Sequence, residues 1–264
     1  MALVIAKIKH RQIVQLVEDG KRLDGRELTE YRNVKVEQGI IERAEGSARV
    51  RLGKTDVVVG TKVELGEPFA DTPGEGVLTV NVELVPLASP GYEAGPPDEN
   101  SIELARIVDR GIRESKMIDT EKLCLEPGKK VYVVFVDVYV LNQGGNLIDA
   151  SAIAAVSALM NTMVPGYEVE DGEFRVKPGS SSQLPVKQHP VTVTCAKIGD
   201  KLVVDPQLEE EQVMDARLSM AVDDDDKICA IQKGGSGYFS PEQVIEFAGL
   251  AVRKAKEMRK KLDW

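Results

Sequence analysis

The chain has 264 residues, of which 42% are hydrophobic, and its formal net charge at pH 7 is −9. This length suffices for one large domain or for two fused halves with a full buried core. The acidic balance excludes a protein that binds nucleic acid over a broad basic face, so a contact with RNA would need a local basic patch.

The apolar residues occur in short runs, such as residues 131–136, far below the roughly 18–20 residues that a membrane span needs. The first residues lack the apolar core of a signal peptide. We therefore expect a soluble, cytoplasmic protein that does not contact a membrane. Cys124, Cys195 and Cys229 are isolated and form no Cys-x-x-Cys pair, so we expect neither a disulfide nor a zinc site.

The first part of the chain alternates predicted strands with loops. Helical spacing of apolar residues predicts a helix over residues 5–20, and a turn-like Arg-Leu-Asp-Gly-Arg run follows at 22–26. Loops rich in proline and glycine are expected at 66–76 and 89–98, before a helix over 99–117. Alternating apolar and polar residues predict strands at 34–36, 48–52, 57–63 and 77–85.

The middle of the chain begins with the almost wholly apolar run 131–141, which predicts a strand at the centre of a sheet. Asp149 is expected to cap a helix of small residues over 150–158. Residues 168–188 are polar and are interpreted as a connection or a poorly ordered hairpin, with 179–182 as a flexible loop. Further strands are predicted at 191–196, 202–204, 219–222 and 228–231.

The last helix is marked by a capping box, with Ser240 at the cap, Pro241 at the first position and Gln243 three residues after the cap. This order of elements predicts an α+β fold built from two related βα halves. We expect a single domain, composed of an N-terminal helix over 1–20, a first half over about 21–165 and a second half over about 190–264.

The helix predicted over 99–117 is the most informative segment. At about 100° per residue its apolar residues form one stripe, and Arg106, Arg110 and Arg113 fall on the opposite side. Three guanidiniums on one exposed face can bind phosphate oxygens. The alternative is a solvated face on which acidic neighbours neutralise the arginines. Those neighbours are Glu103, Asp109 and Glu114.

Two acidic clusters could suggest a metal or an acid–base pair. Residues 223–226 are four aspartates without the alternating ligand spacing of a calcium loop, so we expect a solvated hairpin turn. The acidic residues between 205 and 215 offer no spacing that selects two of them, and a solvated acidic turn is expected there too. They are Asp205, Glu209, Glu210, Glu211 and Asp215. No metal ligand and no cofactor is predicted.

Several separate motifs resemble the RNase PH family of phosphorolytic exoribonucleases and occur in the family's order. They are Arg-Leu-Asp-Gly-Arg at 22–26, Gly-Ser-Ala-Arg-Val at 46–50, and Glu-Leu-Ala-Arg at 103–106 with Arg110 and Arg113. The resemblance spans essentially the whole chain and implies an RNase PH-type domain. Within the family, residues 144–150 and the N-terminal extension most resemble the non-catalytic RNase PH-type subunit of the archaeal exosome.

The chain departs from the pattern of the active members. Where those carry a Gly-Gly-Thr-Arg run that holds the attacking phosphate, this sequence has Asn146 and Leu147, and leucine offers no charge to an anionic nucleophile. Where they place two aspartates, an ungapped match gives Glu211 and Arg217, and an arginine cannot transfer a proton at neutral pH. The resemblance therefore implies a subunit with no catalytic residue.

The resemblance also implies that Arg106, Arg110 and Arg113 contact RNA near the active centre of a catalytic homologue. It implies an alternating heterohexamer of three heterodimers, single-stranded RNA in a central channel, and cap subunits with RNA-binding domains. Two alternatives remain open. One is an active phosphorolytic 3′-to-5′ exoribonuclease with relocated groups, and the other is a structural ring spacer without RNA contact.

Overall fold

The first of two large β-sheets has the strand order β1-β2-β3-β6-β4 in the computed structural model, which describes residues 2–170 and 173–264. Strand β4 pairs with β6 in parallel, while the other neighbours pair antiparallel. The inward residues of β6 are fully buried, which confirms the predicted central strand. The strands are β1 (Val34–Gln38), β2 (Gly46–Leu52), β3 (Thr55–Gly66), β4 (Val77–Leu84), β6 (Lys130–Asn142) and the short β5 (Cys124–Glu126), which pairs with β6.

The second sheet is antiparallel and has the order β10-β9-β11-β12. Every residue of its central strand β9 is buried, because the sheet is covered on both faces. The predicted strands are confirmed, each somewhat longer than expected. They are β9 (Val191–Ile198), β10 (Lys201–Val204), β11 (Ala216–Val222) and β12 (Ile228–Gly234).

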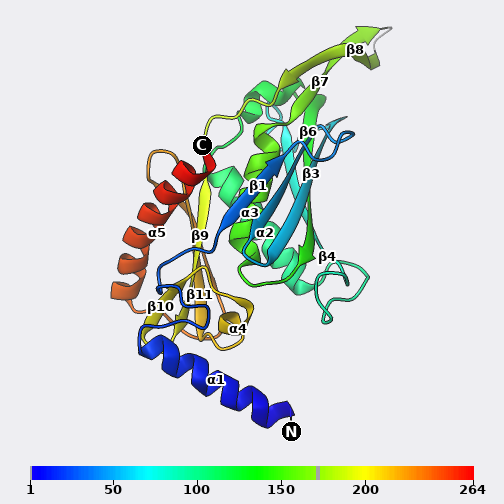
Figure 1. The fold of residues 1–264 in the computed structure, drawn as a ribbon. Coiled ribbons are helices and arrows are strands. Elements are labelled where there is room, and N and C mark those ends of the chain that lie inside the picture. The colour runs from blue at the N-terminus through cyan, green and yellow to red at the C-terminus, as the bar shows by residue number, and fades with distance from the viewer. Residues whose placement is uncertain (1, 171–172) are drawn as a thin grey trace.

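Two helices fill the space between the sheets, and a third covers the outer face of the second sheet (Figure 1). Helix α2 (Glu99–Glu114) packs against β4 and reaches β12. Helix α3 (Leu147–Met160) packs against β2, β3 and β9, and α5 (Pro241–Leu262) packs against β9 and β11. The layers are thus sheet, helices, sheet and helix, which confirms the α+β class. The division into halves of one domain stays a prediction.

Helix α3 is buried from Ile148 to Leu159, because its small side chains face a sheet on either side. The expectation that Asp149 caps this helix is wrong. The cap is Asn146, which adopts a left-handed conformation with φ of 52° and accepts a hydrogen bond from the Asp149 amide at 3.4 Å. Asp149 instead lies in the first turn, where its buried carboxylate accepts hydrogen bonds from Tyr31 and Thr194.

The polar stretch after α3 forms a two-stranded hairpin that projects from the body of the molecule (Figure 1). Its strands are β7 (Met163–Glu170) and β8 (Glu173–Gln183). The hairpin interpretation is therefore confirmed, but the flexible loop expected at 179–182 is wrong, because Ser181 and Ser182 pair with β7. The backbone between the strands, residues 171–172, lies outside the described residues.

The first and last helices of the chain both pack against the second sheet. Helix α1 (Ala2–Glu18) buries Ile13 and Val17 against that sheet. Helix α5 starts with the predicted capping box, in which the Ser240 hydroxyl accepts from the Gln243 amide at 3.2 Å. The aspartate run at 223–226 forms the predicted hairpin turn between β11 and β12, but the turn is only partly solvated, because Asp223 is buried. Lys256 of α5 forms an ion pair with Asp226 at 2.8 Å. The remaining elements are η1 (Thr120–Leu123) and α4 (Leu208–Glu211).

Candidate RNA-contacting site

Helix α2 presents a polar face to solvent. The cap residue sets where the helix begins, and the buried apolar stripe sets which side faces outward. The Asp98 carboxylate caps it by accepting a hydrogen bond from the Ser101 amide at 2.8 Å, and this bond lowers the pKa of Asp98. The predicted apolar stripe is buried between the sheets. The three predicted arginines, Arg106, Arg110 and Arg113, are exposed on the other side.

Arg113 differs from the other two because its guanidinium is held within the chain. It donates to both carboxylate oxygens of Asp109, at 2.7 and 3.2 Å, and to the carbonyl oxygen of Leu78 in β4, at 3.1 Å. The hydrogen bond to Asp109 raises the pKa of Arg113. The alternative interpretation, that acidic neighbours neutralise the arginines, therefore applies to this residue.

Arg106 and Arg110 are available for an external anion. Neither forms a hydrogen bond or an ion pair within the described part of the chain. Both line a groove of about 620 Å³ that runs along the edge strand β4, and Tyr139 and Asp137 of β6 line the same groove. The guanidiniums are one helical turn apart on one face, a spacing that suits successive phosphates of an extended strand.

The residues at which the chain departs from the active pattern come together in a second recess. The Asn146 amide donates to the Glu211 carboxylate at 2.8 Å. Leu147, Glu211 and Arg217 line one pocket of about 300 Å³, which Tyr92 also lines. The structure thus joins two segments that lie about sixty residues apart in the sequence.

The chemistry of this recess is unsuited to a phosphate. The Arg217 guanidinium lies 2.5 Å from the Glu103 carboxylate of α2, so its charge is already compensated. Burial raises the pKa of Glu211 to about 7, against a smaller opposite effect of the hydrogen bond from the Asn146 amide. Among the described residues, the lining offers no uncommitted cation to bind an anion.

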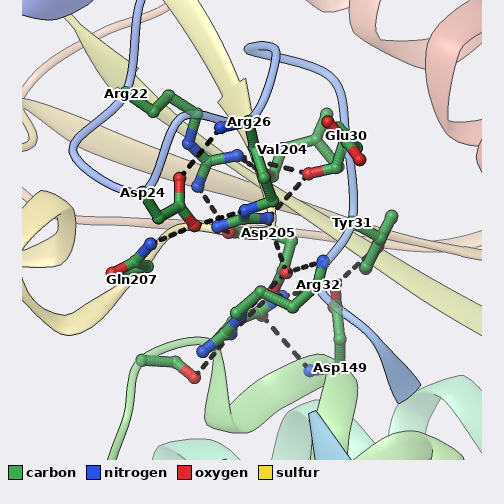
Figure 2. A network of polar contacts seen from close by, with 12 residues as sticks. Arg22, Asp24, Arg26, Glu30, Tyr31, Arg32, Asp149, Val204, Asp205 and Gln207 are labelled. Carbon is green, nitrogen blue, oxygen red and sulfur yellow. Dashed lines mark hydrogen bonds and ion pairs between the residues drawn. The ribbon is translucent and has the colours of Figure 1, made fainter. Parts of the chain in front are cut away.

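The acidic segment beside the recess is buried in a network of arginines, so the solvated acidic turn expected there is wrong for Asp205 and Glu210. Figure 2 shows Asp205 between Arg26 and Arg32. Its carboxylate accepts from Arg26 at 3.0 Å and from Arg32 at 2.7 and 2.9 Å. Such charges tolerate burial because they are paired.

The Arg-Leu-Asp-Gly-Arg motif supplies the other half of this network. Arg22 donates to both oxygens of the buried Glu210, at 2.8 and 2.5 Å. It also donates to the backbone carbonyls of Val204 and Asp205 (Figure 2). The motif therefore ties the segment before β1 to the end of β10. Sequence reasoning missed this clamp, although two distant runs of opposite charge were a visible signal.

Comparisons with known proteins identify the family of this chain. The profile of the 3′ exoribonuclease family, domain 1, matches residues 30–165, and that of domain 2 matches residues 188–254. The chain belongs to the RNase PH family. It is 53% identical to the exosome complex component Rrp42 of Thermococcus kodakarensis over 98% of this chain and 96% of the relative. It is 51% identical to that of Methanopyrus kandleri, over 97% and 96%.

Solved structures show the same RNase PH fold. A chain of the structure titled Archaeoglobus fulgidus exosome with RNA bound to the active site matches with a TM-score of 0.90 and 46% identity, over 98% of this chain and 99% of that one. A chain of an archaeal exosome core matches with a TM-score of 0.87 and 44% identity, over 99% and 98%. Rice Rrp46, at 16% identity and a TM-score of 0.68, shares the fold.

In this RNase PH chain, the glycine loop before α3 is held by side chains and backbone of the chain itself. Arg32 donates to the carbonyls of Gly144 and Gly145, at 2.8 and 3.0 Å. Gly145 has a φ of +91°, and a Cβ there would lie 2.4 Å from the backbone of Gln207, so the position requires glycine. The loop is thus fixed by the second half of the chain.

The described residues contain no helix that is long and apolar enough to cross a membrane. Within the same residues, His, Cys, Asp and Glu side chains form no group that could hold a metal ion.

Proposed function

We propose that this chain is the non-catalytic RNase PH-type subunit of a cytoplasmic exosome, a ring that degrades RNA from the 3′ end. In this proposal it alternates with a catalytic homologue as three heterodimers, and caps with RNA-binding domains complete the particle. The observation that carries the proposal is the Arg217–Glu103 ion pair in the recess beside Leu147. The relatives named as exosome components support the ring assignment.

Catalytic silence follows from the charges of that recess. Phosphorolysis requires an anionic phosphate to be held beside an anionic RNA backbone, which needs a fixed positive group. Leu147 supplies no charge, and the charge of Arg217 is committed to Glu103. The partner subunit would instead supply the phosphate-binding groups and release nucleoside diphosphates.

The test is the release of nucleoside diphosphate from 3′-labelled RNA in excess phosphate. The pure chain is expected to release none, and the chain mixed with its catalytic homologue is expected to release it readily. The homologue alone serves as the reference for the contribution of this subunit. Dose-dependent release by the pure chain, free of any homologue, would falsify the silent assignment.

The role of this chain in RNA contact is assigned to α2. Arg106 and Arg110 are the primary phosphate contacts, because both are exposed and uncommitted in the described part of the chain. Arg113 is a secondary contact, since Asp109 already compensates its charge. The resulting picture is a basic pair that holds the RNA backbone while the neighbouring subunit performs the reaction.

Alanine substitutions in the reconstituted ring test this assignment. Arg106→Ala and Arg110→Ala should each weaken RNA binding by at least about tenfold, because a charge-assisted contact contributes roughly 1.5–3 kcal/mol. Arg113→Ala should have a smaller effect. Arg253→Ala is the matched control, since this exposed helical arginine lies on α5, on the other side of the second sheet. Equal binding by all four variants would favour the structural spacer.

A further inference from the structure

Other arginines hold two of the acidic side chains near Arg106 and Arg110. On α2, Glu103 is bound by Arg217 at 2.5 Å and Asp109 is bound by Arg113 at 2.7 Å. The first of these arginines comes from β11 of the second sheet, and the second comes from the next turn of α2 itself.

A third acidic residue, Glu114, lies four residues after Arg110. It forms no ion pair with Arg110 in the described residues. An acidic residue on the C-terminal side of its basic partner is the weaker of the two arrangements on a helix. Glu103 precedes Arg106 by three residues, so it is the acid of this helix that is best placed to pair with a free arginine.

The Arg217–Glu103 pair has room because the residue beside the Arg217 guanidinium is a glycine. Arg217 lies opposite Gly234 in the β11–β12 register. A Cβ at Gly234 would lie 2.8 Å from Nε and 2.9 Å from Cζ of Arg217, so the guanidinium rests over backbone that carries no side chain. The side chain of Arg217 is 22% exposed and that of Glu103 is 38% exposed, which places the pair at the rim of the recess.

The position of Glu103 gives this pair a consequence for RNA contact. Residues three apart on a helix are surface neighbours, so a released Glu103 carboxylate would lie within reach of Arg106. The Asp109–Arg113 pair shows that acids of this helix do bind nearby arginines. A free carboxylate at 103 would therefore compete with phosphate for Arg106 and would repel the RNA backbone.

We infer that Arg217 is a positioning residue for RNA contact, because it holds Glu103 away from Arg106 and so leaves that guanidinium to the RNA phosphate. This inference rests on the proposed RNA contact of α2. It gives Arg217, which stands where the family resemblance implies a carboxylate, a function of its own.

The test compares Arg217→Gln, Glu103→Gln and the double variant in the reconstituted ring, by RNA affinity at low salt. Arg217→Gln should weaken binding by up to about fivefold, the range that an exposed ion pair spans. Glu103→Gln should leave binding unchanged or strengthen it, and the double variant should bind at least as well as wild type. A merely structural pair predicts the same effect for both single variants, because each breaks the same contact.

Arg106→Ala in the same assay separates this inference from the proposed function. If Arg106→Ala weakens binding while both glutamine variants behave alike, the positioning role is wrong and the RNA contact stands. If Arg106→Ala has no effect, the RNA contact of this residue is wrong and the positioning role falls with it. If Arg217→Gln fails to assemble, Arg217→Met replaces it, since methionine keeps an unbranched side chain but carries no charge to hold Glu103; wild-type affinity of an assembled Arg217→Met ring would then overturn the inference.

Discussion

Arg32 and Asp205 form a buried ion pair in which Nη2 and Nε of the guanidinium donate to the two carboxylate oxygens at 2.7 and 2.9 Å. Asp205 is fully buried and also accepts from Arg26. Removing one partner of such a pair leaves an uncompensated charge in the interior. We expect Asp205→Asn to lower the free energy of unfolding by about 3 kcal/mol or more.

Urea unfolding followed by far-ultraviolet circular dichroism measures this loss. The control is Glu209→Gln, an exposed acid of the adjoining helix α4, which should leave the midpoint unchanged. If Asp205→Asn were as stable as Glu209→Gln, the network would contribute no stability, and the Arg-Leu-Asp-Gly-Arg motif would need another explanation.

A pH-dependent cost to stability is expected from Glu211. Burial raises its pKa from 4.5 to about 7 in the folded chain. Between these values the folded state binds more protons than the unfolded state, so the free energy of unfolding falls as the pH rises from about 4.5 to 7. The glutamine of Glu211→Gln cannot ionise. The free energy of unfolding of this variant should therefore exceed that of wild type by about 1–3 kcal/mol at pH 8.

The two proteins should be equally stable near pH 4.5, where Glu211 is protonated and resembles glutamine. Chemical unfolding at pH 4.5 and pH 8 gives the required difference, and comparing each variant with wild type cancels the titration of every other group. Glu209→Gln again serves as the control and should show no dependence of the difference on pH. A constant difference for Glu211→Gln would contradict the raised pKa.

Local patterns in the sequence predicted most of the fold. The apolar stripe of α2, the central strand β6 and the capping box of α5 were each visible in the chain, because hydrophobic period and cap chemistry act over a few residues. The exposed arginines of α2 were found for the same reason. The cap of α3 was missed because Asp149 bonds to Tyr31 and Thr194, which lie far away in the sequence.

Pairings between distant segments could not be read from spacing alone. The acidic segment around Asp205 resembles a solvated turn in the sequence. Its burial depends on Arg22, Arg26 and Arg32, which lie 173 to 188 residues earlier. In the same way, the sequence did not show that Arg113 is paired while Arg110 is free. It also did not show that Arg217 is the partner of Glu103. These distinctions depend on which side chains the two sheets bring together.

Association with the catalytic homologue is expected to use the face that carries α2. The sheet edges β4 and β12 flank this helix, and open edges favour pairing with another chain. Ile102 and Ile231 are each 49% exposed beside the arginines. Light scattering on the co-expressed pair should report a hexamer. Ile231→Asp should give smaller species, because association would bury the new aspartate charge without a partner.

The control is Ile245→Asp on α5, which is 73% exposed on the opposite side of the second sheet. It should leave the hexamer intact. A hexamer with Ile231→Asp, or a stable monomer of the wild-type chain that ignores the homologue at micromolar concentration, would contradict this use of the α2 face.

The salt dependence of RNA binding distinguishes phosphate contacts from other effects of the arginines. Each phosphate neutralised on a single strand contributes about −0.7 to the slope of log affinity against log salt concentration. Arg106→Ala and Arg110→Ala should therefore each flatten the slope by about 0.7, and the double variant by about 1.4. Arg113→Ala should change it less, because Asp109 already compensates this charge. Since phosphates carry no base identity, the loss of affinity should be the same for RNAs of different sequence.

Titrations of fluorescent RNAs of two sequences at several salt concentrations provide the measurement, with Arg253→Ala as the control. A loss of affinity with an unchanged slope would mean that the arginines act on the ring and not on the phosphates.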